Sequence, residues 1–221
     1  MSRLAGVPAK RTYGDRCGVA RALDVVGERW ALLVVRELLL GPKRFTDLRA
    51  GLPGVSPDVL SQRLRELEEA GIVQRRTLPP PAGSRVYELT ERGEELEPIL
   101  IQLGRWGSGA PFPAGEPQMG ADATLLALKT LFSPNASDGL LATFGLRLDD
   151  QDFTVHVGSG LIRTVRGPAE HPDATIETSP GTLATVLWHG RKLADAERKG
   201  DMKIEGDKRA VKQFLRVFPL R

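Results

Sequence analysis

The stretch from Ser56 to Gly71, SPDVLSQRLRELEEAG, predicts a helix with both ends specified. Ser56 is a favourable N-cap, because its hydroxyl can accept a hydrogen bond from a free backbone N–H. Pro57 suits the first helical position, and Gly71 suits the left-handed residue that ends many helices. The apolar side chains share one face at helical spacing: Leu60, Leu64 and Leu67. The chain must therefore supply a core against which this helix packs.

The opposite face of this helix is uneven along its length. Its first two turns carry short and medium polar groups with an arginine, whereas Glu66, Glu68 and Glu69 crowd the far end. Phosphate would repel that acidic end, so only the N-terminal half can approach nucleic acid. Helix-turn-helix proteins present the same half to base edges in the major groove. An ordinary amphipathic surface helix would share the apolar face, so the flanking segments decide.

Net charge is distributed asymmetrically. Residues 1–85 hold 15 Lys and Arg against 9 Asp and Glu, a net charge of +6, and residues 86–107 hold 2 against 5. Residues 108–221 hold 14 of each. The basic excess therefore coincides with the predicted reading helix, which indicates a polyanionic partner for that part.

Segments before the reading helix predict a small helical core. We expect helices over residues 17–26 and 28–40, separated at Gly27 and ended by Gly41-Pro42. A short helix over 45–49 and a turn over 51–55 lead into the reading helix. Residues 1–14 are expected to form a flexible basic arm.

Segments after the reading helix predict a projecting hairpin and a further helix. Residues 72–78 and 85–89 are expected to pair as strands around Pro79-Pro80-Pro81, whose missing N–H donors keep the tip unpaired. A basic hairpin over residues 75–87, directly after a reading helix, indicates the wing of a winged helix. Thr90 then caps a helix to Trp106. Its apolar face lies outside the core and is predicted to pack against the same helix of a second subunit: Leu96, Ile99, Leu100, Leu103 and Trp106.

Several separate motifs between residues 17 and 107 resemble the HxlR family of winged-helix transcriptional regulators, which are MarR-like. They are CGVARALDVVGERWALLVVREL, GPKRFTDL, SPDVLSQRLRELEEAGIVQRR and VYELTERGEEL. The resemblance implies a homodimer on a pseudo-palindromic operator of double-stranded DNA, with the reading helix in the major groove. The predicted DNA-binding residues are Lys43, Arg44, Ser56, Pro57, Asp58, Val59, Ser61, Gln62, Arg63, Arg65, Arg75, Arg76 and Arg85.

Cys17 is the only cysteine, so no disulfide can form within one chain. It lies near a predicted helix N-terminus beside Arg16 and Arg21, which favours a reactive thiolate. Some members of the resembled family sense oxidants through a cysteine at this place. A small residue packed at a helix start is the equally weighted alternative.

The second half of the chain predicts a separate domain. Residues 108–121 are rich in Gly and Pro and are expected to form a linker between domains 1–107 and 122–221. Helices are expected over 123–132, 182–189, 195–199 and 208–218, with strands over 140–148, 153–157, 161–165 and 174–177. Residues 172–190 and 200–218 resemble a sterol-carrier-protein-like domain, whose layered α/β fold encloses an apolar cavity. Candidate cavity residues, which would otherwise fill a closed core, are Phe144, Phe153, Leu161, Leu183, Leu187, Trp188 and Phe214.

Other site types find no support in the sequence. The three histidines are far apart and one cysteine cannot complete a zinc set, so no metal or other cofactor is expected. No nucleophile, base and orienting group occur together, so no enzyme is expected. The chain carries no apolar run long enough to span a membrane and no signal-peptide pattern, which predicts a cytoplasmic protein without a membrane partner.

The predicted fold class is therefore α+β in two domains: a winged helix-turn-helix followed by a sterol-carrier-like layer. The first function that fits is a dimeric DNA-binding transcriptional regulator, modulated by a hydrophobic small molecule in the second domain or by oxidation of Cys17. The alternative is a lipid or hydrophobic-ligand carrier whose N-terminal domain serves mainly for dimerisation. The reading helix, the wing and the charge of +6 favour the regulator.

Overall fold

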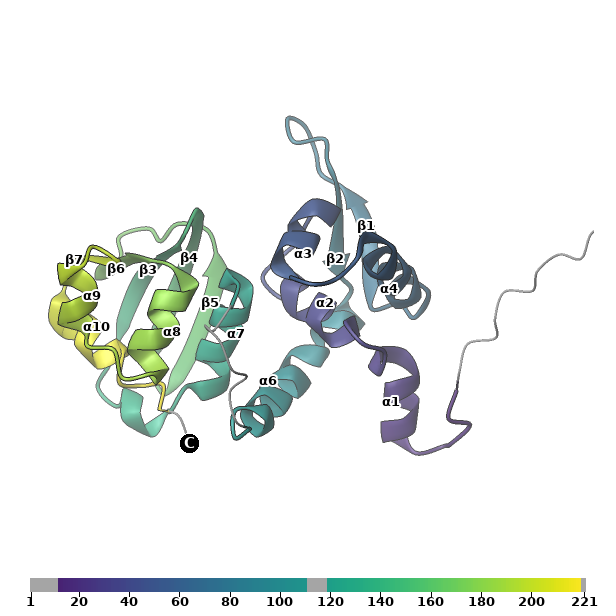
Figure 1. The fold of residues 1–221 in the computed structure, drawn as a ribbon, viewed down its shortest axis with the longest axis horizontal. Helices are drawn as coiled ribbons and strands as arrows, with labels where there is room; N and C mark the ends of the chain where they lie inside the picture. Colours follow the sequence, from purple (N-terminus) through teal and green to yellow (C-terminus); the bar gives the residue numbers. More distant parts are fainter. Residues whose placement is uncertain (1–11, 111–118, 220–221) are drawn as a thin grey trace, which may run out of the picture.

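A computed structural model describes residues 12–110 and 119–219, termed here the N-terminal half and the C-terminal half (Figure 1). Most of the predicted basic arm, and residues 111–118 of the predicted linker, lie outside the described residues. Each half has its own hydrophobic core.

The N-terminal half is a winged helix-turn-helix, as the sequence predicts. Its elements are α1 (Gly18–Val26), α2 (Ala31–Leu38), α3 (Phe45–Gly51), α4 (Pro57–Glu69), β1 (Val73–Thr77), β2 (Arg85–Leu89), α5 (Glu91–Glu94) and α6 (Leu96–Gly107). The strands β1 and β2 pair antiparallel, and the loop between them projects from the rest of the half (Figure 1). The three leucines of α4 are fully buried against this core, so the reading helix is fixed by packing.

Two helix predictions in this half need correction. The helix expected over 28–40 begins only at Ala31, because Trp30 at its N-cap takes a left-handed conformation with φ of 77°. The helix expected from Thr90 to Trp106 is divided into α5 and α6 at Glu95. Thr90 does cap α5, since its hydroxyl accepts a hydrogen bond from the N–H of Gly93 at 3.1 Å.

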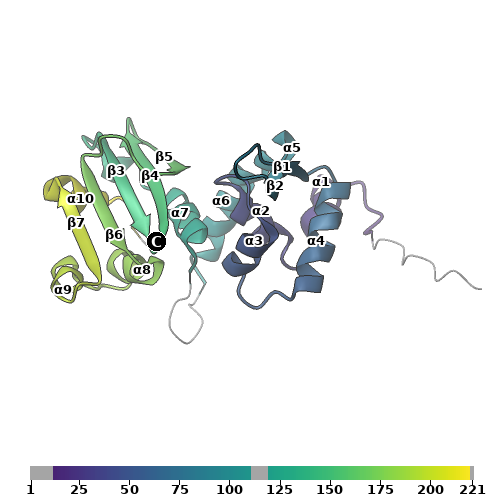
Figure 2. The same cartoon turned by 90° about the horizontal axis from the view of Figure 1, so that it is seen from above.

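The C-terminal half is a five-stranded sheet with helices packed on one face (Figures 1 and 2). Its elements are α7 (Ala121–Leu131), the 3-10 turn η1 (Asn135–Ser137), β3 (Ala142–Leu148), β4 (Gln151–Gly158), β5 (Leu161–Arg166), β6 (Ala174–Thr178), α8 (Pro180–Trp188), α9 (Leu193–Arg198), β7 (Met202–Gly206) and α10 (Lys208–Phe214). The strand order is β5-β4-β3-β6-β7, with only β3 and β6 parallel. The strand β7 was not predicted from the sequence, and the last helix ends at Phe214, short of the expected residue 218.

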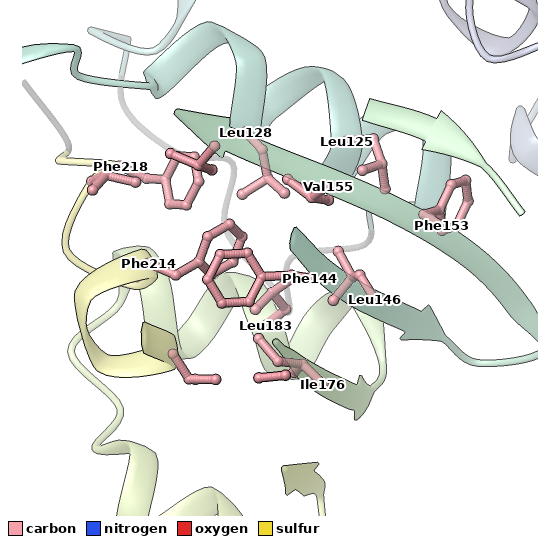
Figure 3. Close-up of a cluster of buried hydrophobic side chains, with 14 of the residues drawn as sticks. Leu125, Leu128, Phe144, Leu146, Phe153, Val155, Ile176, Leu183, Phe214 and Phe218 are labelled. Atoms are coloured by element: carbon pink, nitrogen blue, oxygen red, sulfur yellow. The ribbon is translucent and has the colours of Figure 1, made fainter. Parts of the chain in front are cut away.

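Alternation along the strands explains the single covered face. Phe144 and Leu146 of β3 lie opposite Val155 and Phe153 of β4, and all four are buried. The intervening residues, such as Thr143 and His156, form the other, polar face. The helices α7, α8 and α10 close the core over the apolar face (Figure 3).

This core fills the place where the sequence predicted a cavity. Phe144, Phe153, Leu183 and Phe214 have no exposed surface at all, and the rings of Phe144 and Phe214 lie 4.4 Å apart (Figure 3). A side chain that lined a cavity large enough for a water molecule would keep some accessible surface. The prediction that these four residues line a ligand cavity is therefore wrong for this conformation.

The other three predicted cavity residues lie elsewhere. Leu161 begins the edge strand β5 and is 71% exposed, so it lines no interior space. Leu187 and Trp188 are half-buried at the end of α8 and pack against the core from its rim. Only Trp188 reaches a large cavity, and that cavity lies between the two halves of the chain.

The two halves meet chiefly where α7 lies against α6 (Figures 1 and 2). Gly104 allows this approach, because a Cβ there would lie 3.1 Å from the side chain of Thr130. Arg105 Nε donates to the carbonyl oxygen of Thr130 at 3.0 Å, and Lys129 pairs with Glu97 at 2.5 Å. The C-terminal half thus packs against α6, which is also the helix predicted to form the dimer.

Candidate nucleic-acid interface

The first turns of α4 form an exposed polar surface whose orientation is set by the N-cap. Ser56 Oγ accepts a hydrogen bond from the N–H of Val59 at 3.3 Å, and Pro57 takes the first helical position. Of the DNA-binding residues predicted on α4, only Arg63 is buried. The other seven are exposed or half-buried: Ser56, Pro57, Asp58, Val59, Ser61, Gln62 and Arg65. We call these seven residues and the wing (residues 75–87) the reading surface.

Hydrogen bonds link three side chains of α4: Arg65, Gln62 and Glu66. Arg65 Nη2 donates to Gln62 Oε1 at 2.6 Å, and Gln62 Nε2 donates to Glu66 Oε1 at 2.7 Å. Both Gln62 and Arg65 remain exposed. An amide and a guanidinium at this place have the donors and acceptors that read adenine and guanine edges.

Two arginines of the wing are paired with acidic side chains, and a third is unpaired within the part of the chain that the structure describes. Arg75 pairs with Glu68 at 2.8 Å and lies over the ring of Tyr87, while Arg76 pairs with Glu88 at 2.7 Å. Arg85 is exposed and makes no side-chain hydrogen bond or ion pair among the described residues. Arg85 is therefore the wing cation most available to a phosphate.

Two predicted DNA contacts are corrected by the structure. Arg63 points inward: its guanidinium pairs with Glu66 and lies 3.6 Å from Glu28, which ties α4 to the turn between α1 and α2. Lys43 is also buried, and its Nζ lies 2.8 Å from Glu37 Oε2 and 2.6 Å from Asp122 Oδ2. Arg44, the neighbour of Lys43, does remain exposed.

Lys43 belongs to a buried ion-pair network that the sequence analysis missed. Glu37 also pairs with Arg36 at 2.9 Å, and Asp122 also pairs with Arg166 of β5. This network of five residues joins α2, the segment before α3, α7 and β5, so it crosses between the halves. Glu37 was the available signal, because it falls on the buried stripe of α2 beside Val34 and Leu38, where an unpaired charge would be costly.

Exposed apolar side chains lie on α6 and on α1. Ile99, Leu103 and Trp106 are 56%, 45% and 82% exposed, and α1 adds Val19 and Leu23. The two helices are neighbours, because both line the hollow at residues 18–26 and 95–99. Of the predicted dimerisation residues, Leu100 is buried in the monomer core and Leu96 packs against it, so these two are corrected to core residues.

Cys17 is exposed and occupies the N-cap position of α1. Its backbone N–H donates to Asp15 Oδ1 at 2.9 Å, and its carbonyl oxygen accepts from the N–H of Arg21 at 3.0 Å. The exposed thiol contradicts the alternative prediction of a small residue packed at the start of the helix. No group of three or more metal-ligating side chains occurs within residues 12–110 and 119–219. In the same ranges, no helix has the length and apolar character needed to cross a membrane.

Comparison with known proteins separates the two halves. The sequence model of the HxlR-like helix-turn-helix family matches residues 25–111, and the alkyl sulfatase C-terminal model matches residues 130–219. The second match covers the sheet and helices α8 to α10, and it does not test the sterol-carrier-like fold expected from the sequence, which stays a prediction.

Known relatives cover the N-terminal half. The uncharacterized HTH-type transcriptional regulator YvaP of Bacillus subtilis is 41% identical over 88 residues, which is 40% of this chain and 82% of YvaP. The HTH-type transcriptional regulator YodB of the same organism is 36% identical over 85 residues, 38% of this chain and 76% of YodB. The match to the crystal structure of quinone-bound YodB covers 42% of this chain and 97% of the YodB chain, with 32% sequence identity and a TM-score of 0.37. The family model and the relatives YvaP and YodB show that the chain belongs to the HxlR-like helix-turn-helix family.

Proposed function

We propose that this protein is a homodimeric transcriptional regulator that binds a pseudo-palindromic DNA operator through the reading surface. The observation that carries the proposal is the uneven exposure of α4: its leucines are buried while its first two turns present Ser56, Gln62 and Arg65 outward. The proposed domains are residues 1–107 for DNA binding and dimerisation and residues 122–221 for sensing, with residues 108–121 as the linker.

The exposed apolar surface of α1 and α6 supports dimerisation. An apolar surface of this kind is costly in water and commonly marks an interface. A pseudo-palindrome needs the two α4 helices of such a dimer about 34 Å apart, one turn of B-DNA. The proposed contacts are Ile99, Leu103 and Trp106 with Val19 and Leu23.

Oxidation of Cys17 is the modulation that we propose for the regulator. The thiol is exposed at a helix N-cap, and α1 carries part of the proposed dimer surface. A disulfide to a second chain or to a small thiol would therefore change the packing of α1 at the interface. The proposal does not include a hydrophobic ligand inside the C-terminal core, because side chains fill that core. The carrier alternative loses its support for the same reason.

The direct test is a titration of the full chain against labelled DNA from its own upstream region, with sedimentation to define the assembly. We expect a dimer that binds one fragment with an affinity that falls steeply with salt. Leu103→Lys should yield monomers and weaken binding, whereas Gln213→Lys, at an exposed position of α10 outside the proposed dimer surface, should do neither. Tight binding by a wild-type monomer would overturn the dimer proposal.

A second arm tests the thiol. Mild diamide should change the DNA affinity of the wild type and leave that of Cys17→Ser unchanged. An equal response of both proteins would end the redox proposal without touching the proposal of DNA binding.

A further inference from the structure

A large cleft lies between the two halves, apart from the reading surface and from the predicted interior cavity. Its volume is about 1320 Å³, larger than a typical small-molecule site of about 300–1,000 Å³. Both halves supply its walls: Trp30 and Ala50 come from the N-terminal half, and Leu126, Asp150 and Trp188 come from the C-terminal half.

The cations in this cleft are already paired. Lys43 contacts two carboxylates, Arg36 pairs with Glu37, and Arg166 pairs with Asp122 while donating to Gln151 Oε1 at 2.9 Å. These ion pairs are buried to different degrees. To bind one of the cations, an anionic ligand would have to break an ion pair and leave a carboxylate without that partner. Such a break is costly in a partly desolvated site.

The carboxylates of the cleft are in excess. Five line it, Glu37, Asp47, Asp122, Asp149 and Asp150, against three cations, which leaves a net charge of −2. Asp149 and Asp150 form the turn between β3 and β4, are exposed, and make no side-chain hydrogen bond or ion pair among the described residues. They adjoin Gln151, which holds Arg166, so the free negative charge lies next to the ion-pair network.

The remaining lining suits a flat apolar body. Half-buried indoles come from both sides, Trp30 from the N-terminal half and Trp188 from α8, with Leu126 and Leu131 of α7 between the halves. Indole faces attract cations and stack on aromatic rings. Arg29 already lies over the Trp30 ring, 5.2 Å from its centroid. Apolar walls with a few unpaired charges of one sign are the usual makeup of a site for an amphipathic molecule.

We propose that the cleft between the halves is a binding site for an aromatic, lipophilic cation, with Asp149 and Asp150 as its counter-charges. A ligand held by both walls stabilises the arrangement of the halves in which the walls face each other. Because the C-terminal half is mounted on α6, that arrangement is tied to the proposed dimer helix. Binding itself does not depend on the proposed function, and only this regulatory consequence rests on it.

The test uses the full chain without DNA and the fluorescent cation rhodamine 6G, followed by anisotropy. We expect saturable binding of one dye per chain, and no saturable binding of fluorescein, an anion of similar size. Asp149→Asn with Asp150→Asn should weaken dye binding at least tenfold. Asparagine is well suited to position 149, where φ is 55°. The matched control, Asp138→Asn with Glu170→Gln, removes two exposed carboxylates outside the cleft and should bind as wild type does.

A second pair of variants locates the site. Ala50→Trp places an indole into the cleft from an exposed position of the N-terminal wall, so it should weaken dye binding at least fivefold without unfolding the protein. Ala136→Trp, at an exposed position outside both the cleft and the reading surface, should not change dye binding. The proposal is overturned if rhodamine 6G does not saturate, if fluorescein binds equally well, or if the paired aspartate variant or Ala50→Trp binds like wild type. Each of these results leaves DNA binding by the reading surface intact.

Discussion

The reading surface and the ion-pair network use the same residue types in opposite ways. On the reading surface, Arg65 and Arg85 lie exposed, and Arg65 is held only by an amide. In the network, Lys43 is buried between two carboxylates from different halves of the chain. The difference shows that a basic segment contains both exposed cations that a ligand could reach and buried, paired ones. Burial and pairing, which net charge does not reveal, assign each residue to its role.

The largest expected effect comes from the network. Lys43→Met should lower the free energy of unfolding by about 3 kcal/mol, because Glu37 and Asp122 would lose their shared partner while still buried. Arg36 and Arg166 still pair with these acids, which keeps the loss at the lower end of the range. Urea unfolding measures it, with the exposed Lys199→Met as a control that should change stability by under about 0.5 kcal/mol. Equal stability of the two variants would show that the network contributes little.

Two neighbouring arginines of α4 sharpen the comparison. Arg63→Met should destabilise the fold by about 1–3 kcal/mol, because its guanidinium bonds Glu66 beneath the surface. Arg65→Met should leave stability nearly unchanged and weaken operator binding by about 1–3 kcal/mol. Unfolding and DNA titration of both variants separate the roles. If Arg63→Met keeps full stability but loses DNA affinity, Arg63 contacts DNA, as predicted from the sequence, and the structural role assigned to it is wrong.

These same residues show which structural features could be predicted from the sequence. Capping and periodicity predicted α4 to within two residues at either end, because Ser56, Pro57 and Gly71 act locally. The inward turn of Arg63 and the pairing of Lys43 with Asp122, 79 residues away, depend on tertiary neighbours that periodicity does not contain. The C-terminal aromatics were identified as interior, but apolar residues that fill a core and those that line a cavity have the same pattern. Only packing distinguishes them.

A smaller effect concerns the cap that orients the reading surface. Ser56→Ala should cost about 1 kcal/mol of folding stability, because the N–H of Val59 loses its acceptor. Ser61→Ala, on the same helix without a capping role, serves as the control and should cost less. Thermal unfolding of the two variants at equal concentration checks this. Indistinguishable melting temperatures would mean that packing alone holds the start of α4.

The smallest expected effect lies in the wing. Arg85→Ala should weaken binding to all DNA sequences alike, and the slope of log K against log salt should become shallower by about 0.9 per lost phosphate contact. Arg209→Ala removes an exposed cation from α10 and should leave the slope unchanged. An unchanged slope for Arg85→Ala would place the wing away from the DNA backbone.

The central claim, that the exposed first turns of α4 read DNA sequence, is tested most directly with Gln62→Ala. The measurement is the ratio of affinities for the operator and for a scrambled duplex of equal length and composition, at one salt concentration. We predict that the substitution lowers this ratio by the equivalent of about 1–3 kcal/mol, through weaker operator binding with scrambled-duplex binding nearly unchanged. A ratio equal to that of the wild type would contradict the claim.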